Sequence, residues 1–465
     1  MLKQLKNQIL YCIIAGASIM PTTTMFAQNG AITPAMLEQF KKEVQAYPQA
    51  TVLRNAISNN SIRQLSINNQ NKYQVDDNFT YKVKTEGITD QKNSGRCWLF
   101  ASLNVMRAKT IQTHKMKEFS FSQNYSFFYD QLEKANLFLE EIIRTANKPM
   151  DDRTVEWLFK NPIADGGTWA GFVNVANKYG LVPQSVMPDT KQTESTGAIT
   201  QVIATVLKED GLKLRGMFAS KAKPESLQNT KKEMLSTVYR ILSLSLGEPP
   251  TKFNWRFEAK DGKYSEVKEY TPLSFKEAFV GSDLSEYVML MDDPSREYYK
   301  MYEIEYDRNN HEGINWIYLN VPAAEITPAA VASLKDGEGM YFSCDVGKQL
   351  DRDNGVLDLN NYATNELFGI TNTMNKKDRI ITFESASSHG MVLSGVELGQ
   401  DGKPMRWLIE NSWGKSGHDG YLVMTHDWFN EYMFRVVVDK KYLNADQQRL
   451  LNQKPIKLPP WDPMY

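Results

Sequence analysis

The sequence predicts an α+β fold made of two lobes, and three observations lead to this prediction. Helical patterns rich in Lys and Glu fill the chain to about residue 335. Runs with the character of short strands follow, and they are MYFSCDV (340–346), HGMVLSGVEL (389–398), MRWLIEN (405–411), GYLVM (420–424) and FRVVVD (434–439). Because helices come first and strands last, without alternation, the order favours a helical lobe and a β-rich lobe with a cleft between them.

The helical part has recognisable elements. Residues 34–75 are typical of an exposed leader, helical at first and then rich in Asn turns. In 92–135 a glycine turn precedes a helix whose Phe100, Leu103 and Met106 recur at three-residue spacing and give it an apolar face. The stretch 190–335 contains KKEMLSTVYRILSLSL, which predicts an amphipathic helix, and loops rich in Tyr and Asp. In the β-rich part, GQDGK between the second and third runs predicts a hairpin.

Length and composition agree with a packed protein. The 465 residues are 42% hydrophobic, 11% aromatic and 23% charged, which is enough for one large domain or two to three smaller ones. Lys and Arg number 54 and Asp and Glu 55, so the formal net charge is −1. Since no basic excess is available to hold phosphate backbones, nucleic acid is not expected as a partner.

The first 27 residues have the three-part layout of a secretory signal peptide. Lys3 and Lys6 precede an apolar run over 9–20, and a polar stretch follows it. The run is shorter than the roughly 20 residues that span a bilayer. We expect cleavage after Ala27, no stable membrane span afterwards, and export to a bacterial periplasm or the extracellular space. A buried N-terminal helix or an uncleaved anchor is the alternative, and without a working signal the protein is cytoplasmic.

The chain has three cysteines. Cys12 lies in the apolar run and leaves with the signal, so Cys97 and Cys344 remain. Two cysteines are too few for a disulfide framework, and no CxxC pair or His/Cys cluster indicates a zinc site. We expect no metal and no organic cofactor.

The segment QKNSGRCWLFA (91–101) indicates a reactive thiol. Gly95 permits a tight turn, and Cys97 then opens a helix, where the helix dipole and free N–H groups favour the thiolate. Gln91 lies six residues upstream, where its side-chain NH₂ and the Cys97 backbone N–H would form a two-donor oxyanion hole. The alternative for an isolated cysteine is a small apolar residue in the core.

A thiolate peptidase also needs a base and a group that orients it. His389 stands at the head of an apolar strand, and Asn411 stands at the end of the strand after the hairpin, so the two side chains are expected to meet. Trp413 would cover their hydrogen bond, and it is also a candidate contact for the substrate. The alternative is that His389 is a surface or turn residue and Asn-Ser-Trp-Gly a simple turn. The remaining histidines receive no role, and they are His114, His311, His418 and His426.

Gln91, Cys97-Trp98, His389 and the Asn-Ser-Trp-Gly run at 411–414 follow one another in the order of the papain-like cysteine peptidases, which this sequence resembles. In ordinary members the His follows the Cys by roughly 130–150 residues. Here 292 residues (389 − 97) separate them. The excess points to a branch with a large insertion.

That branch is the one of bleomycin hydrolase and the bacterial aminopeptidase C enzymes, which the sequence resembles from about residue 60 to 465. The segments that carry the resemblance are DGGTWAGFVNVANKYGLVP (165–183), YFSCDVGK (341–348), ENSWG to DKKYL (410–443) and LPPWDPMY (458–465). The resemblance implies a papain-like two-lobed fold with a large helical insertion and a C-terminal arm that enters the cleft.

The layout of the first residues and the resemblance together predict how the chain is divided. Expected are a signal peptide (1–27), a leader and first part of the peptidase domain (28–90), a helical lobe with the nucleophile (91–190), a helical insertion (191–335), a β-rich lobe with His and Asn (336–445), and the C-terminal arm (446–465).

For the site, the resemblance implies that Gly166 and Gly167 pair with the backbone of the substrate and that Cys344 is a buried strand residue. Members of the branch form hexamers whose sites face an inner chamber. The terminal carboxylate of their arm receives the α-ammonium of the substrate. The implied activity is a thiol aminopeptidase acting on peptides with a free N-terminus.

Two departures leave alternatives open. The chain stops at Tyr465, directly after Met464, whereas relatives carry a few more residues, so Tyr465 either lies farther from Cys97 or fills a subsite. Release of di- or tripeptides, or endopeptidase action in an open cleft, would then replace single-residue removal. The signal peptide is the second departure. A binding protein that keeps the fold without catalysis is the other alternative, and the complete set of Gln, Cys, His and Asn argues against it.

Overall fold

The computed structural model describes residues 30–71, 78–281 and 283–465. The chain divides into two units, one ending at Leu65 and one running from Ser66 to Tyr465. The predicted signal peptide (1–27) lies outside the described residues. No helix within the described ranges has the length and apolar character of a membrane span.

The described part of the first unit is helical. It consists of α1 (Pro34–Ala46), α2 (Ala50–Asn59) and α3 (Ile62–Leu65), and none of these three helices has a buried residue. Pro34 at the first position and the side chain of Thr33, which accepts from the Met36 N–H, start α1.

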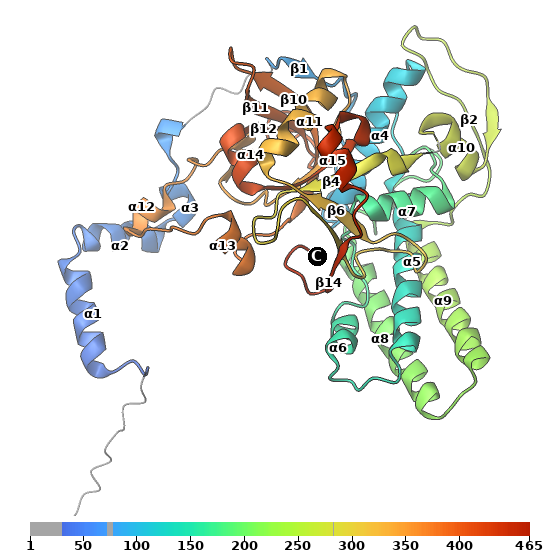
Figure 1. The fold of residues 1–465 in the computed structure, drawn as a ribbon, viewed down its shortest axis with the longest axis horizontal. Helices are drawn as coiled ribbons and strands as arrows, with labels where there is room; N and C mark the ends of the chain where they lie inside the picture. Colours follow the sequence, from blue (N-terminus) through green and yellow to red (C-terminus); the bar gives the residue numbers. More distant parts are fainter. Residues whose placement is uncertain (1–29, 72–77, 282) are drawn as a thin grey trace, which may run out of the picture. The chain divides into compact units, whose positions relative to one another are not determined.

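Helices dominate the first half of the second unit, as the sequence predicts. They are α4 (Cys97–His114), α5 (Gln123–Arg144), α6 (Arg153–Lys160), α7 (Trp169–Tyr179), α8 (Gly197–Ala219), α9 (Pro224–Leu246) and α10 (Pro272–Phe279). Helices α5, α8 and α9 pack along one another, and α4 packs against α7 (Figure 1). A small antiparallel pair, β2 (Phe253–Trp255) and β3 (Lys268–Tyr270), interrupts this part.

The second half forms one large sheet. Within the described residues it has twelve strands. Their bounds are β1 (Tyr81–Lys82), β4 (Tyr287–Met291), β5 (Lys300–Ile304), β6 (Trp316–Asn320), β7 (Met340–Cys344), β8 (Leu350–Asp351), β9 (Val356–Leu357), β10 (His389–Leu398), β11 (Pro404–Glu410), β12 (Tyr421–Thr425), β13 (Met433–Asp439) and β14 (Ile456–Leu458). The order across the sheet is β14, β5, β6, β4, β13, β7, β10, β11, β12, β9 and β8, with β1 beside β10.

The five predicted strands are confirmed as β7, β10, β11, β12 and β13, and the predicted hairpin joins β10 to β11 as antiparallel neighbours. The prediction of a helical block to residue 335 is wrong for residues 287–320. There YVMLM, KMYEI and WIYLN form β4, β5 and β6 before α11 (Ala323–Lys335). These runs are five residues long and rich in aromatic and β-branched side chains, which suits a strand better than a helix.

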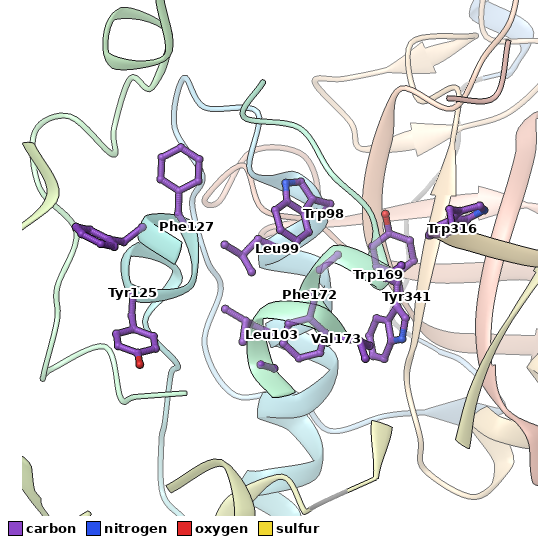
Figure 2. Close-up of a cluster of buried hydrophobic side chains, with 14 of the residues drawn as sticks. Trp98, Leu99, Leu103, Tyr125, Phe127, Trp169, Phe172, Val173, Trp316 and Tyr341 are labelled. Atoms are coloured by element: carbon purple, nitrogen blue, oxygen red, sulfur yellow. The ribbon is translucent and has the colours of Figure 1, made fainter. Parts of the chain in front are cut away.

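Successive residues of the central strands pack into two different cores. Tyr341, Val392 and Val437 join the core that the helical lobe fills, whereas their neighbours Phe342 and Leu393 join the core beneath α11 and α14 (His426–Tyr432). This alternation follows from the two-residue period of a strand. Figure 2 shows the first core, where side chains of α4 and α7 meet Tyr341 of the sheet. Helix α4 is thereby fixed against β7 and β10.

Candidate active site

The turn before α4 is held from several directions. The Gly95 N–H donates to Oδ2 of Asp165 at 2.8 Å, and a Cβ at Gly95 would stand 2.3 Å from that carboxylate, so only glycine fits. The buried guanidinium of Arg96 pairs with Asp189 at 3.0 Å. Cys97 is the first residue of the helix and is only partly buried. The structure therefore confirms that the thiol stands at the N-terminus of a helix.

The base and its orienting group meet as the hairpin predicts. His389 begins β10, where it pairs with Cys344 of β7, and it is 7% exposed. Asn411 directly follows β11 and is 1% exposed. Nε2 of His389 donates to Oδ1 of Asn411 at 2.9 Å, and the Ser412 N–H donates to the same oxygen at 2.8 Å. The amide therefore presents its oxygen to the ring, which leaves the other ring nitrogen for Cys97.

The thiol and the imidazole shift each other's protonation. Burial opposes charge on Cys97, but the charge of His389, a hydrogen bond with its ring, and the N–H groups of Gly390 and Trp98 outweigh it and lower the pKa of Cys97. Burial also opposes charge on His389, but Cys97 and the hydrogen bond to Asn411 raise the pKa of His389. Both directions favour a thiolate beside an imidazolium, which is the nucleophilic state of such a pair.

Trp413 covers the histidine. Its ring stacks on that of His389 with 4.9 Å between centroids and 28° between planes. On the Trp413 ring lies the guanidinium of Arg352, at 4.8 Å from the centroid. The positive charge of Arg352 is close enough to lower the pKa of His389 in part. Trp413 is not among the residues that line the cleft, so its predicted contact with the substrate stays a prediction.

Gln91 is buried and its amide is fixed on both sides. Oε1 accepts from the Ser412 hydroxyl at 2.6 Å, and Nε2 donates to the backbone oxygen of Ser94 at 2.6 Å. The second hydrogen of Nε2 is the one left for an oxyanion. Gln91 is not among the residues that line the cleft, so the expected oxyanion hole with the Cys97 N–H stays a prediction.

A cleft of about 420 Å³ opens over the thiol. Cys97 and His389 line it, together with three of the predicted substrate contacts, namely Gly166, Gly167 and Tyr465. The cleft is partly apolar and partly charged: further lining residues include Trp98, Lys134, Trp157, Asp307, Tyr341 and Arg435.

The two glycines form one wall and differ in their surroundings. A Cβ at Gly167 would stand 2.7 Å from the ring of Trp98, whereas a Cβ at Gly166 would have no atom within 4 Å. The Gly166 carbonyl accepts from Nζ of Lys134 at 2.5 Å. The glycine edge is thus held close to Trp98 while its Gly166 side stays open, which suits approach by a peptide backbone.

The C-terminal arm reaches the cleft. β14 pairs in parallel with β5, and beyond it Asp462 forms an ion pair with Arg296 while the Met464 carbonyl accepts from Arg435. Met464 is 1% exposed. These contacts place Tyr465 in the cleft lining, where its ring meets the edge of Trp157 at 5.1 Å between centroids.

Sequence reasoning missed Lys134, Asp307 and Arg352 because nothing local marks them. Lys134 and Arg352 stand in ordinary charged stretches, and Asp307 in a polar loop; only the folded chain brings them to the site. Among the described residues, no three His, Cys, Asp or Glu side chains gather as a metal would require.

Known proteins resemble this chain over nearly its whole length. The model of the Peptidase C1-like family matches residues 31–465. Aminopeptidase G of Lactobacillus delbrueckii subsp. lactis is 40% identical over 432 residues, which cover 93% of this chain and 98% of the relative. Bleomycin hydrolase of Gallus gallus is 38% identical over 437 residues, covering 91% and 96%. The crystal structure of PepW from Lactobacillus rhamnosis HN001 superposes with a TM-score of 0.90 at 39% identity, covering 94% and 99%.

The family match and the superposition on PepW confirm two predictions made from the sequence. These are the papain-like α+β fold and the resemblance to this branch of peptidases. The chain belongs to the Peptidase C1-like family, as a cysteine peptidase of the aminopeptidase C and bleomycin hydrolase branch.

Proposed function

We propose that the protein is a thiol aminopeptidase that cleaves peptide bonds near the free N-terminus of peptides through Cys97, His389 and Asn411. The observation that supports this most directly is that the thiol, the imidazole and the Tyr465 arm share one cleft. Because the arm lies in the cleft, a peptide has room to extend only away from it. The names of the relatives, aminopeptidases C, E, G and W, agree with this reading.

In the first half of the reaction the Cys97 thiolate attacks the scissile carbonyl. The Cys97 N–H and the second hydrogen of the Gln91 amide stabilise the oxyanion. The His389 imidazolium donates its proton to the leaving amine, which leaves an acyl-enzyme. Asn411 keeps the ring in the required orientation, since its amide oxygen is held by the Ser412 N–H.

In the second half neutral His389 accepts a proton from water, and the resulting nucleophile hydrolyses the thioester. The thiol is then restored. Trp413 lies over the ring and limits the access of bulk water to the bond between His389 and Asn411.

The test compares one peptide with a free N-terminus and the same peptide N-acetylated. We expect cleavage of the free-amine peptide to be faster by at least about tenfold, which corresponds to about 1.4 kcal/mol. Equal rates on the two peptides would reject the aminopeptidase and indicate an endopeptidase. Release of di- or tripeptides would show that the enzyme cleaves the substrate at its second or third peptide bond.

Cys97→Ala separates catalysis from binding. We expect no measurable turnover, with substrate binding retained. In protein without residues 1–27, and so without Cys12, iodoacetamide should label Cys97 and abolish activity, whereas Cys97→Ala should not be labelled, because Cys344 is fully buried. Full activity in Cys97→Ala would reject the proposed nucleophile.

Two further properties are proposed on other grounds. The layout of residues 1–27 supports export, and sequencing the N-terminus of protein recovered from the source cells tests it. Resemblance to the branch supports a hexamer, which the mass of the purified protein in solution tests. That the terminal carboxylate of Tyr465 receives the α-ammonium stays a prediction from the resemblance.

A further inference from the structure

Asp307 brings a negative charge to the wall of the active-site cleft. It stands in the loop between β5 and β6, and its backbone is fixed because the Trp316 N–H donates to its carbonyl at 2.8 Å. Tyr306, directly before it, has φ 64°, the left-handed conformation that turns the chain after β5. The Tyr306 hydroxyl donates to Glu141 at 2.9 Å, which anchors this turn on α5.

The carboxylate of Asp307 has no partner among the residues that the structure describes. Among the described residues, none donates a hydrogen bond to its buried Oδ2, and none forms an ion pair with it. Burial raises the pKa of Asp307 to about 6, while the nearby charges of Arg435 and Lys134 act in the opposite direction. At neutral pH the group is therefore mostly ionised, although a buried charge without a partner is costly.

The cations near Asp307 contact other groups, although Nε of Arg435 is buried without a hydrogen-bond partner among the described residues. Arg435 of β13 donates to the Met464 carbonyl and lies on the ring of Trp316. Lys134 of α5 forms an ion pair with Asp130 at 2.8 Å and also donates to the Gly166 carbonyl. Both charges favour the ionised carboxylate, but among the described residues neither cation forms an ion pair with it.

The other charged or titratable groups that face Asp307 do not neutralise it either. Arg308, the next residue, donates to Asn315 at 2.9 Å and lies 3.9 Å from Glu141. Tyr341 of β7 and Tyr465 of the arm are phenols. Burial of each phenol and the charge of Asp307 both contribute to raising their pKa values, although Tyr465 as a whole residue is half exposed. An unpaired carboxylate thus stands in the same cleft as Cys97 and the tip of the arm.

We propose that Asp307 forms the binding site for an alkylammonium group of the substrate, at the end of the cleft that the C-terminal arm occupies. The group is the free α-ammonium of the peptide, or a lysine side chain beside the scissile bond. Either supplies the charge-assisted hydrogen bonds that the carboxylate lacks. The proposal rests on the proposed aminopeptidase function, and it makes Asp307 a specificity-determining residue that leaves the chemistry to Cys97 and His389.

The test is Asp307→Asn, assayed with three peptides of one sequence: one with a free N-terminus and a neutral side chain before the scissile bond, its N-acetylated form, and an N-acetylated form with lysine at that position. For the peptide whose ammonium Asp307 binds, we expect KM to rise by about tenfold or more with kcat little changed. In the native enzyme the same KM should fall as the pH rises through about 6, because the carboxylate ionises there, and the variant should lose this dependence.

Glu305→Gln is the matched control. Glu305 lies two residues away but outside the cleft lining, 3.5 Å from Lys457, and its two kinetic constants should stay unchanged. Labelling of Cys97 by iodoacetamide counts intact sites in each variant. The unfolding temperature of Asp307→Asn above pH 6 should equal or exceed that of the native protein, because an unpaired buried charge is removed.

The outcomes identify the source of the ammonium. A rise in KM confined to the free-amine peptide assigns the α-ammonium, and a rise confined to the lysine peptide assigns the side chain. Unchanged KM for both would overturn the proposal and leave the Tyr465 carboxylate as the recognition group. Equal native rates on free and acetylated peptides reject the aminopeptidase function by itself, whatever Asp307→Asn does to the lysine peptide.

Discussion

At the scale of single residues, the candidate site is an electrostatic balance around one imidazole. Cys97 and Asn411 favour the protonated ring of His389, while burial and the charge of Arg352 oppose it. Arg352 and His389 both lie on the ring of Trp413, which places the guanidinium near enough for its charge to act on the imidazole. Removing a group that raises or lowers the pKa of His389 should therefore shift the pH range in which the thiolate and the imidazolium coexist.

The alkaline limit of activity tests this balance. It reports loss of the imidazolium proton, and the raised pKa of His389 places it above the ordinary value of 6.5. Asn411→Ala removes a hydrogen bond that raises this pKa, so the limit should move to lower pH. Arg352→Met removes a like charge that lowers it, so the limit should move to higher pH. The measurement is kcat/KM against pH, and a shift in the same direction for both variants would contradict the balance.

The residue scale also marks where sequence reasoning succeeds. Cys97, His389 and Asn411 were predictable because each stands at an element boundary with a distinctive neighbour: the Gly95 turn, the head of an apolar strand, and the Ser-Trp-Gly turn. Asp307 was not predictable. Its significance comes from missing partners, and those depend on where Arg435 and Lys134 lie after folding.

At the scale of elements, α4 and β11 are joined by an ion pair that is almost fully buried. Arg107 of α4 and Glu410 of β11 are paired, with 2% and 0% of their side chains exposed. One stands on the helix that begins at Cys97, and the other directly precedes Asn411. The pair therefore couples the position of the thiol to that of the group that orients His389.

Removing one partner of this pair should be costly. Arg107→Met leaves the Glu410 carboxylate buried without a counter-charge, and we expect a loss of about 3–5 kcal/mol in the free energy of unfolding. The double variant Arg107→Met with Glu410→Gln should recover much of that loss, because no lone charge remains. Urea unfolding of the single and double variants measures the loss and the recovery in the free energy of unfolding. Additive losses would show that the two residues act independently.

The glycine edge of the cleft gives a second prediction at this scale. In Gly167→Ala the new methyl group would stand 2.7 Å from Trp98, which is 1% exposed and cannot retreat, so we expect lower stability by about 1–3 kcal/mol and lower activity. Gly166→Ala is the control for stability, since it has open space around it. The measurement is the thermal unfolding temperature of each variant. Equal destabilisation of Gly166→Ala and Gly167→Ala would contradict the contact between residue 167 and Trp98.

Elements were predictable where their pattern was long or flanked by clear turns. β10 and β11 run ten and seven residues around a Gly-Gln-Asp-Gly turn and were found with nearly correct bounds. β4, β5 and β6 have five residues each and stand among Lys, Glu and Asp residues typical of exposed helices. Their strand character comes from burial in the sheet, which is a tertiary effect that local propensity does not carry.

At the scale of the second unit as a whole, the sheet separates two cores, and the chain end returns to the cleft. The helical lobe lies on one face, while α11 and α14 cover the other. The arm leaves this arrangement along β5 and is anchored by Arg296 and Arg435. The resemblance made the arm predictable, whereas its anchors, which lie more than a hundred and sixty and about thirty residues away in sequence, were not.

Loosening the arm should broaden the specificity. Removing residues 459–465 keeps β14 but deletes the tip, so the cleft would be open at both ends. We expect the ratio of activity on N-acetylated to free-amine peptides to rise by at least about tenfold. Arg296→Met, which removes the ion pairs with Asp462 and Asp293 but keeps the arm, should give a smaller rise in the same direction. A parallel loss of both activities, with the ratio unchanged, would show that the arm supports folding and does not restrict the cleft.

A cleft that is blocked at one end also dictates the order of events in each turnover. Under the proposed acyl-enzyme route, the longer fragment lies toward the open end and departs first, while the short N-terminal fragment remains between Cys97 and the arm. This fragment has to leave by the mouth through which the next peptide enters. Free amino acids should therefore compete with incoming substrate for one place, so that the enzyme slows as its own product accumulates.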